Sequence, residues 1–322
     1  MKSYLGKLIF AGLLMICFFD CSSESKPEKE IAAIEVDLVV ERFDRLFGNS
    51  SAADLPRLKA AYPFMFSSSY SDQDWINRMN DSLQKQLHAE VNSEFSDFPE
   101  EEDIADLFRH LKYHYKEFSV PRVITVTSDV DYRNKTIVTD TISLIALDTY
   151  LGADHEFYGG IQEYIKQGFE REMILSDLCG AYAEKYIYRG PSKTFLEDMI
   201  YYGKLLYFKD MMIPKTSDAL KIGYSVDQLE WAIANESNIW RYFIENELLY
   251  KTDAKLAGRF INPAPFSKFN LELDRESPGR LGQYIGWQIV RSYMDKNDIN
   301  FKELFIKSGK EIFENSGFKP RK

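Results

Sequence analysis

Two histidines stand four residues apart in the stretch HLKYH, as His110 and His114. On a helix this spacing places both imidazoles on one face, where they could share a metal ion. In a zinc-peptidase helix, a glutamate directly after the first histidine acts as base on the metal-bound water. Leu111 occupies that position here, within an apolar stripe. We therefore interpret the pair as partly exposed helix residues and predict no metal and no cofactor.

A second stretch that could do chemistry is ESPGRLGQYIGWQ, which holds three glycines around Arg280. It lacks the G-x-G-x-x-G order and the preceding hydrophobic strand that a dinucleotide site requires. Pro278, after a serine cap, instead predicts the first residue of a helix, with Gly282 and Gly286 on one face. Such a face admits a closely packed neighbouring helix. Alternatively, the helix N-terminus beside Arg280 could receive an anionic ligand.

Other catalytic signatures are missing from the sequence. It contains neither a G-x-S-x-G elbow nor a G-x-x-x-x-G-K-[ST] phosphate loop. Cys179 is the only cysteine outside the N-terminal region and lies among apolar residues, so we interpret it as a small buried hydrophobe. The formal net charge of −10 disfavours nucleic-acid binding.

Residues 1–20 have the pattern of an export signal. Lys2 and Lys7 form a positive region before an apolar run, Leu8 to Phe19, that is too short to span a bilayer comfortably. Cys21 follows this run and precedes polar chain, the order expected of a lipoprotein signal. Cys17 is the competing lipid acceptor, and an ordinary signal peptide or a short uncleaved anchor is the alternative. We predict a signal peptide over 1–20, lipid on Cys21 and a flexible polar tether over 21–33.

The sequence pattern predicts a single α-rich globular domain over residues 34–322. Ser71 and Asp74 have the spacing of a capping box, and so do Ser225 and Gln228. β-Branched residues alternate with period two between residues 121 and 152, which predicts a small, mostly antiparallel sheet. The fold class is therefore α+β and predominantly helical. Later helices are expected near residues 161–167, 170–188, 194–212, 225–249, 278–296 and 300–308.

Several stretches taken together resemble the gliding-motility lipoprotein GldB family. These are ALDTYLGADHEFY, DMIYYGKLLYF, IGYSVDQLEWAIANESNIWRYFIENELLYKTD, RFINPAPFSKF and ESPGRLGQYIGWQIVRSYM. The similarity runs in order from about residue 37 to residue 305. It implies a cell-envelope lipoprotein of bacteria of the Bacteroidetes type, needed for the motility machinery and with no established catalytic activity. The implied partners are other gliding-motility envelope proteins, and the N-terminal lipid would hold the protein at a membrane. We expect the periplasm-facing outer membrane, with the inner membrane as the alternative.

Part of the chain is more distantly similar to predicted zinc peptidases that carry an HExxH-type helix, an E-G-containing helix and a P-x-x-x-G-Y-x-x-G-type helix. The last element survives as Pro278, Gly282, Tyr284 and Gly286. Tyr202 stands where the glutamate of the second element would be, and the stretch at the first, MILSDLCGAYAEKY, contains no histidine. Without such ligands zinc cannot be held. The similarity implies a zincin-like fold with a cleft that has lost its metal.

Our leading hypothesis is a non-enzymatic binding or scaffold protein of the motility machinery, with a degenerate metallopeptidase fold. We expect its ligand cleft to be lined by Tyr202, Glu276, Arg280 and Trp287. The alternative is an envelope hydrolase acting on peptide or glycan, which needs an acid/base pair within hydrogen-bond reach. Glu184, Glu236 or Glu276 could contribute to that pair. A third hypothesis is a pure scaffold whose cleft stays empty.

We expect the purified mature protein to contain no stoichiometric zinc and to melt at the same temperature with and without a chelator. The reason is that the sequence supplies no complete ligand set. Metal analysis and thermal melting measure this. Stoichiometric zinc with a chelator-induced fall in Tm would refute the lost-metal interpretation and direct a search for peptidase activity to His110 and His114.

Overall fold

The computed structural model describes residues 26–191, 193–270 and 274–322. The predicted signal peptide and the two candidate lipid acceptors, Cys17 and Cys21, lie outside these residues. In the part of the chain that is described, no helix combines the length and the hydrophobicity of a membrane span.

The strands of the described chain form one four-stranded sheet in the order β1-β2-β4-β3. They are β1 (Val40–Arg42), β2 (Arg122–Val126), β3 (Thr136–Val138) and β4 (Ile142–Ala146). The pairs β1–β2 and β2–β4 are parallel, and only β3–β4 is antiparallel. The predicted α+β class is confirmed, but the prediction of a mostly antiparallel sheet is wrong. A long helical crossover between β1 and β2 permits parallel pairing, and β3 takes the sheet edge, so that β2 and β4 become neighbours.

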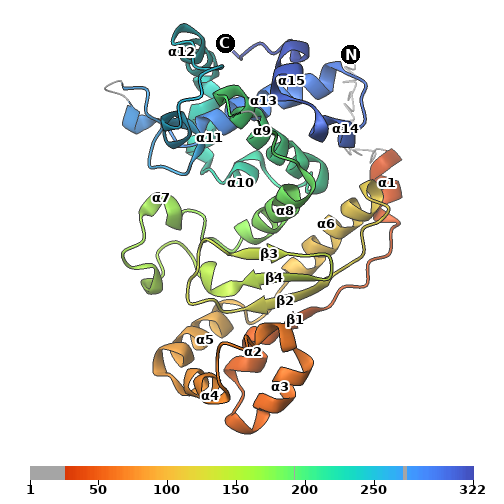
Figure 1. Ribbon diagram of the computed structural model, residues 1–322, viewed down its shortest axis with the longest axis vertical. Helices are drawn as coiled ribbons and strands as arrows, with labels where there is room; N and C mark the ends of the chain where they lie inside the picture. Colours follow the sequence, from red (N-terminus) through yellow and green to blue (C-terminus); the bar gives the residue numbers. More distant parts are fainter. Residues whose placement is uncertain (1–25, 192, 271–273) are drawn as a thin grey trace, which may run out of the picture.

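Helices cover both faces of this sheet (Figure 1). On one face, Ile124, Val126 and Ala146 pack with Phe43 and Phe47 in a smaller core. The elements of this layer are α2 (Phe43–Gly48), η1 (Ala52–Asp54), α3 (Leu55–Ala61), η2 (Pro63–Met65), α4 (Asp72–Asn80) and α5 (Ser82–Glu94). Burial on both faces accounts for the β-branched composition of the central strands.

The larger core lies on the opposite face, where Val123 and Ile145 contact the other helices. α6 and α8 lie next to the sheet, and the later helices stack beyond them (Figure 1). The remaining elements are α6 (Glu100–His114), η3 (Leu147–Thr149), η4 (Glu156–Tyr158), α7 (Glu163–Lys166), α8 (Met173–Tyr186), α9 (Phe195–Met212), α10 (Asp218–Ile222), α11 (Val226–Ala234), α12 (Glu236–Glu245), η5 (Ala257–Ile261), η6 (Asp274–Glu276), α13 (Leu281–Lys296), α14 (Phe301–Ile306) and α15 (Gly309–Ser316).

The segment predicted as a flexible tether is partly ordered. Residues 26–32 form α1 (Lys26–Ala32), which packs on α6 and buries Ile31. The Tyr113 hydroxyl donates to a Glu30 carboxylate oxygen at 3.3 Å. The tether prediction is therefore wrong for these residues, because one apolar side chain and α6 provide a docking surface that composition alone does not reveal.

Predicted caps are present, but several helix boundaries differ from the prediction. The Ser71–Asp74 and Ser225–Gln228 capping boxes both form. The helix expected over 225–249 is divided at Asn235 into α11 and α12. α13 begins at Leu281 instead of Pro278, because Arg280 has φ +61° and interrupts the helical backbone.

The backbones of α9 and α13 touch where the two helices cross. A Cβ atom on Gly203 would overlap the backbone of Gly286, and a Cβ atom on Gly286 would overlap the Met199 carbonyl group. A Cβ atom on Gly282 would likewise approach the Ile261 side chain to 2.8 Å. The glycines of the 276–288 stretch thus serve helix packing and do not form a phosphate loop.

We expect Gly286→Ala to lower the free energy of unfolding by about 2–3 kcal/mol. Overpacking typically costs roughly 1–3 kcal/mol, and here the added methyl group meets backbone, which cannot move aside. Urea denaturation measures the change. Gly258→Ala is the matched control, because no atom lies within 4 Å of its Cβ position; it should be neutral or stabilising by up to about 1 kcal/mol. Equal effects of the two substitutions would contradict the close crossing.

Candidate functional site

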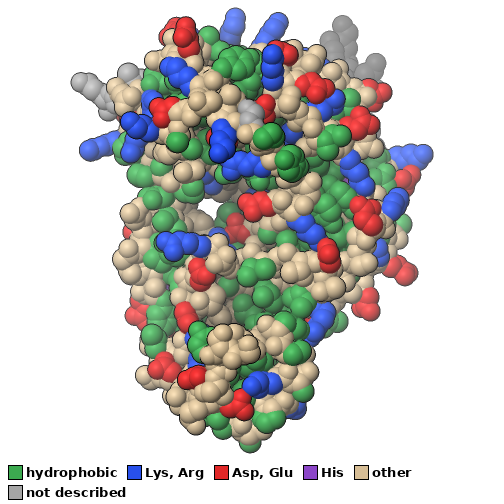
Figure 2. Space-filling model, viewed as in Figure 1, with side chains coloured by type: hydrophobic (Ala, Val, Ile, Leu, Met, Phe, Trp, Pro, Cys, Tyr) green, Lys and Arg blue, Asp and Glu red, His purple; other side chains and the backbone are tan. Residues whose placement is uncertain are grey.

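Tyr202 and Arg280 line the same cavity, which has a volume of about 300 Å³ and is here named the cleft. Figure 2 shows the molecule hollowed between the helices around α10 and the strand β3, with lysine and arginine side chains on both sides of the opening. The residues that line the cleft are Tyr132, Arg133, Lys135, Thr136, Asp177, Gly180, Ala181, Glu184, Tyr202, Leu205, Leu206, Lys209, Lys221, Ile222, Arg280 and Gln283.

Two helices supply the cleft walls with polar residues at a regular spacing. Asp177 and Glu184 lie seven residues apart on α8, and Tyr202 and Lys209 lie seven residues apart on α9. Seven residues are two helical turns, so each pair shares one helix face. Gly180 lies between the two acids, and a Cβ atom there would be 3.4 Å from Lys209 Cε. The small residue leaves space for the lysine side chain in the cleft.

Arg280 is held in place at the start of α13. Its Nη2 donates to the Gly223 carbonyl oxygen at 2.6 Å, and its guanidinium carbon lies 5.2 Å from the centroid of the Tyr224 ring. Gly223 has φ +70°, and a Cβ atom there would approach the guanidinium to 3.2 Å. The Tyr224 hydroxyl donates to the Gly279 carbonyl oxygen, which fixes the turn before α13. Burial lowers the pKa of Arg280.

The other two residues predicted for the cleft lie elsewhere. Glu276 is exposed at the end of η6 and does not line the cavity. Trp287 is fully buried, and its indole N–H donates to Asp210 Oδ2 at 2.8 Å. The structure thus separates the four residues: Arg280, just before α13, lines the cleft, whereas Trp287, within α13, lies in the core.

Lys135, Asp177 and Tyr150 form a connected group at the base of the cleft. The Lys135 ammonium is ion-paired with Asp177, and the Tyr150 hydroxyl donates to Asp177 Oδ2 at 3.0 Å. The Lys135 Nζ also lies 4.7 Å from the Tyr150 ring centroid and donates to the Gly168 carbonyl oxygen at 2.7 Å. Asp177 is therefore already engaged by two donors.

An ion cluster at the edge of the cleft joins α9, α10 and α13 and includes the lining residue Lys221. Arg291 makes bidentate hydrogen bonds to Asp210, both at 2.7 Å, and to Asp218, at 2.8 and 2.9 Å. The buried Lys221 ammonium is 3.0 Å from Asp210 Oδ1. Burial disfavours the charge on Arg291, but its hydrogen bonds to the two carboxylates raise its pKa overall. These paired charges fix the helices that carry the cleft residues.

Of the three glutamates considered for an acid/base role, only Glu184 lines the cleft. Glu236 is buried and accepts hydrogen bonds from the Tyr284 hydroxyl at 2.8 Å and from the Arg321 backbone at 2.9 Å. Its position is structural, beside the C-terminal segment. No pair of these three glutamates shares the cleft.

The histidine pair occupies a packed region away from the cleft. His110 is 1 % exposed, so the prediction of a partly exposed residue is wrong for this position. His114 packs against Phe301, with ring centroids 5.0 Å apart. In the described part of the chain, no group of three or more His, Cys, Asp or Glu residues could hold a metal ion. Cys179 is buried, as predicted, and burial raises its pKa to about 12.

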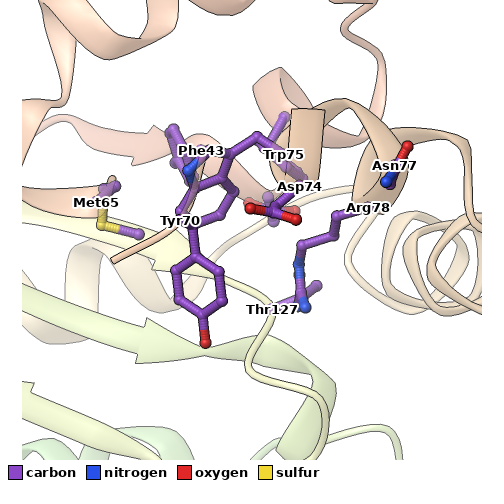
Figure 3. A pocket seen from close by; sticks show the side chains of 10 residues that line it. Phe43, Met65, Tyr70, Asp74, Trp75, Asn77, Arg78 and Thr127 are labelled. Atoms are coloured by element: carbon purple, nitrogen blue, oxygen red, sulfur yellow. The ribbon is translucent and has the colours of Figure 1, made fainter. Parts of the chain in front are cut away.

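A second cavity of about 390 Å³ opens among the N-terminal helices. Figure 3 shows Phe43, Tyr70 and Trp75 near one another, with Arg78 and Asp74 to one side. The charges here are internally satisfied: Arg78 forms a bidentate pair with Asp129 at 2.8 and 2.9 Å, and Asp74 caps its own helix. This cavity is an aromatic opening of the smaller core, with no uncompensated charge among these groups.

The sequence does not mark out the basic residues of the cleft, chiefly Lys135, Lys209 and Lys221. A signal was present only for Lys209, since polar residues interrupt the apolar helices α8 and α9 at two-turn spacing. The spacing alone does not predict that the polar faces of α8 and α9 line one cleft. Their arrangement depends on the α9–α13 crossing and on β3, which is distant in the chain.

Comparisons with known proteins give one match. The family model described as gliding motility protein GldB matches residues 24–320. No curated protein and no solved structure matches the chain. The distant similarity to zinc peptidases stays a prediction.

We expect stability to fall as the pH is lowered from about 6.5 to about 4, partly because of His114. Burial lowers the pKa of His114 from 6.5 to about 4, so in this window the unfolded chain binds a proton that the folded chain does not. Burial also lowers the pKa values of His88 and His110, with the same sign. His114→Gln should reduce the loss by about 1–2 kcal/mol, allowing for partial solvent screening.

Urea denaturation of both proteins at pH 7.5 and pH 4.5 measures this effect. At pH 7.5 the histidine is neutral in both states, so any difference there reports lost packing alone. An identical difference at the two pH values would contradict the titration.

Proposed function

The chain belongs to the gliding motility protein GldB family, and on this basis we propose that it is a non-enzymatic binding component of the motility machinery. Family membership indicates a role in gliding motility and an association with the cell envelope. Within that role, lipid on Cys21 anchors the protein, with the folded domain facing the periplasm from the outer membrane. The partners are other envelope proteins of the machinery, and the cleft is the ligand site.

The observation that carries this proposal is the state of the acidic groups in the cleft. Asp177 is engaged by Lys135 and Tyr150. Glu184 lies two helical turns away, about 10 Å along the axis, and the other candidate glutamates lie outside the cleft. General acid–base catalysis requires groups within hydrogen-bond reach of the reacting atoms. Instead, the cleft offers fixed basic side chains, which suit recognition of a ligand.

The second candidate is an envelope hydrolase, and one observation favours it. Asp177 and Glu184 both line the cleft from the same face of α8. If the Lys135–Asp177 pair opened on substrate binding, the two carboxylates would flank a bound substrate. This function requires both acids, whereas a binding role does not require Glu184 to exchange protons.

We expect Glu184→Gln to restore gliding in a bacterium that lacks the native gene, because the neutral isostere retains the shape of the cleft. Cys21→Ser should fail to restore it, since the unlipidated protein would leave the membrane fraction. Cell speed on agar and the distribution of the protein between membrane and soluble fractions measure these outcomes.

Glu163→Gln is the matched control, since that carboxylate is 83 % exposed and does not line the cleft. Loss of gliding with Glu184→Gln, at normal protein abundance and with a normal control, would overturn the binding role in favour of the hydrolase. Full gliding with Cys21→Ser would overturn the anchoring.

A further inference from the structure

The described lining of the cleft is basic in an acidic protein. It contains five basic and two acidic side chains, while the whole chain has a formal net charge of −10. The overall charge therefore does not account for the excess. Two of the basic residues, Lys135 and Lys221, have carboxylate partners, Asp177 and Asp210.

Lys209 and Arg280 have no such partner. Among the described residues, no carboxylate oxygen forms an ion pair with either side chain within 4.0 Å, although both line the cleft. The Lys209 ammonium donates to Ser176 Oγ at 2.8 Å and to the Lys221 carbonyl oxygen at 2.9 Å. Because an ammonium has three N–H groups, one donor stays available. Arg280 Nη2 donates a hydrogen bond to the Gly223 carbonyl oxygen, and the guanidinium group has further N–H donors.

The two cations also act on each other. Burial lowers the pKa of Lys209, the charge on Asp177 acts in the opposite direction, and Arg280 and Lys135 lower it further. Like charges that are removed from water without counterions are costly. A bound anion would compensate both cations. In the free protein the two positive charges therefore repel each other, and a negatively charged ligand relieves this repulsion.

The remaining lining has a different character. Tyr132, Tyr202, Leu205, Leu206 and Ile222 flank the basic residues. The volume of about 300 Å³ is at the lower end of small-molecule sites. The ligand should therefore combine one anionic group with a small apolar or aromatic part.

We propose that the cleft binds a small ligand through a carboxylate or phosphate group placed between Lys209 and Arg280, with the apolar part of the ligand against Tyr202 and Leu205. Arg133, exposed at the rim, adds a third positive charge near the entrance. This proposal rests on the proposed binding role and names the class of its ligand.

The test uses the full chain in a nonionic detergent, with three probes in titration calorimetry and thermal melting at low salt. The probes are inorganic phosphate, N-acetyl-leucine and its neutral amide, N-acetyl-leucinamide. We expect one of the two anions to bind and to raise Tm, and the amide not to do so. Binding of phosphate alone identifies a phosphate ligand, and binding of N-acetyl-leucine alone identifies a carboxylate ligand. Binding of neither anion, or equal binding of the amide, overturns the proposal.

Substitutions locate the site. Lys209→Gln and Arg280→Gln should each weaken anion binding at least tenfold, and Arg133→Gln should weaken it a few-fold without affecting the fold, because its side chain is exposed. Arg57→Gln removes the same charge from a side chain that is 77 % exposed on α3 and should have no effect. Unchanged binding in both Lys209→Gln and Arg280→Gln overturns the assignment, provided that each variant melts cooperatively.

Gliding assays separate the two proposals. If Lys209→Gln and Arg280→Gln abolish anion binding but the cells glide normally, gliding does not require the anionic ligand. The proposed role in motility would then be unaffected. If the cleft binds an anion but Cys21→Ser still supports gliding and Glu184→Gln abolishes it, the ligand site is retained and the proposed non-enzymatic, lipid-anchored role is overturned.

Discussion

The close crossing of α9 and α13 is the contact on which the rest of the structure depends. Gly203 and Gly286 allow the two backbones to touch, and any larger side chain would separate them. The crossing sets the positions of residues on both sides. Arg280, at the start of α13, reaches the cleft that Lys209 of α9 also lines, and about two turns further along α13 Trp287 reaches Asp210.

Charge is distributed unevenly around this crossing. Beside the cleft, Arg291 and the lining residue Lys221 are neutralised by carboxylates, so that cluster stabilises the arrangement of three helices. Inside the cleft, Lys209 and Arg280 lack carboxylate partners among the described residues. Their hydrogen bonds to backbone and hydroxyl oxygens position them without neutralising them. Ligand recognition requires charge that is fixed and still available.

The candidate site could be predicted only in part. Tyr202 and Arg280 were identified from the sequence and do line one cavity, but Glu276 and Trp287 do not. Residues close together in the chain can face opposite directions, and here the positive φ of Arg280 sets the direction in which α13 starts. Lys135 was missed because it comes from the segment before β3, far from the helices in sequence.

The sequence by itself determined the local features: the α+β class, the helix caps at Ser71 and Ser225, and the buried position of Cys179. These depend on residue type and on spacing within a few turns, which a sequence displays directly. Only the tertiary structure decided the parallel pairing of β2 with β4, the folding of residues 26–32 into α1 against α6, and the meeting of basic side chains in the cleft. Each of these depends on contacts between residues far apart in the chain, whose free energy comes from packing and charge in three dimensions.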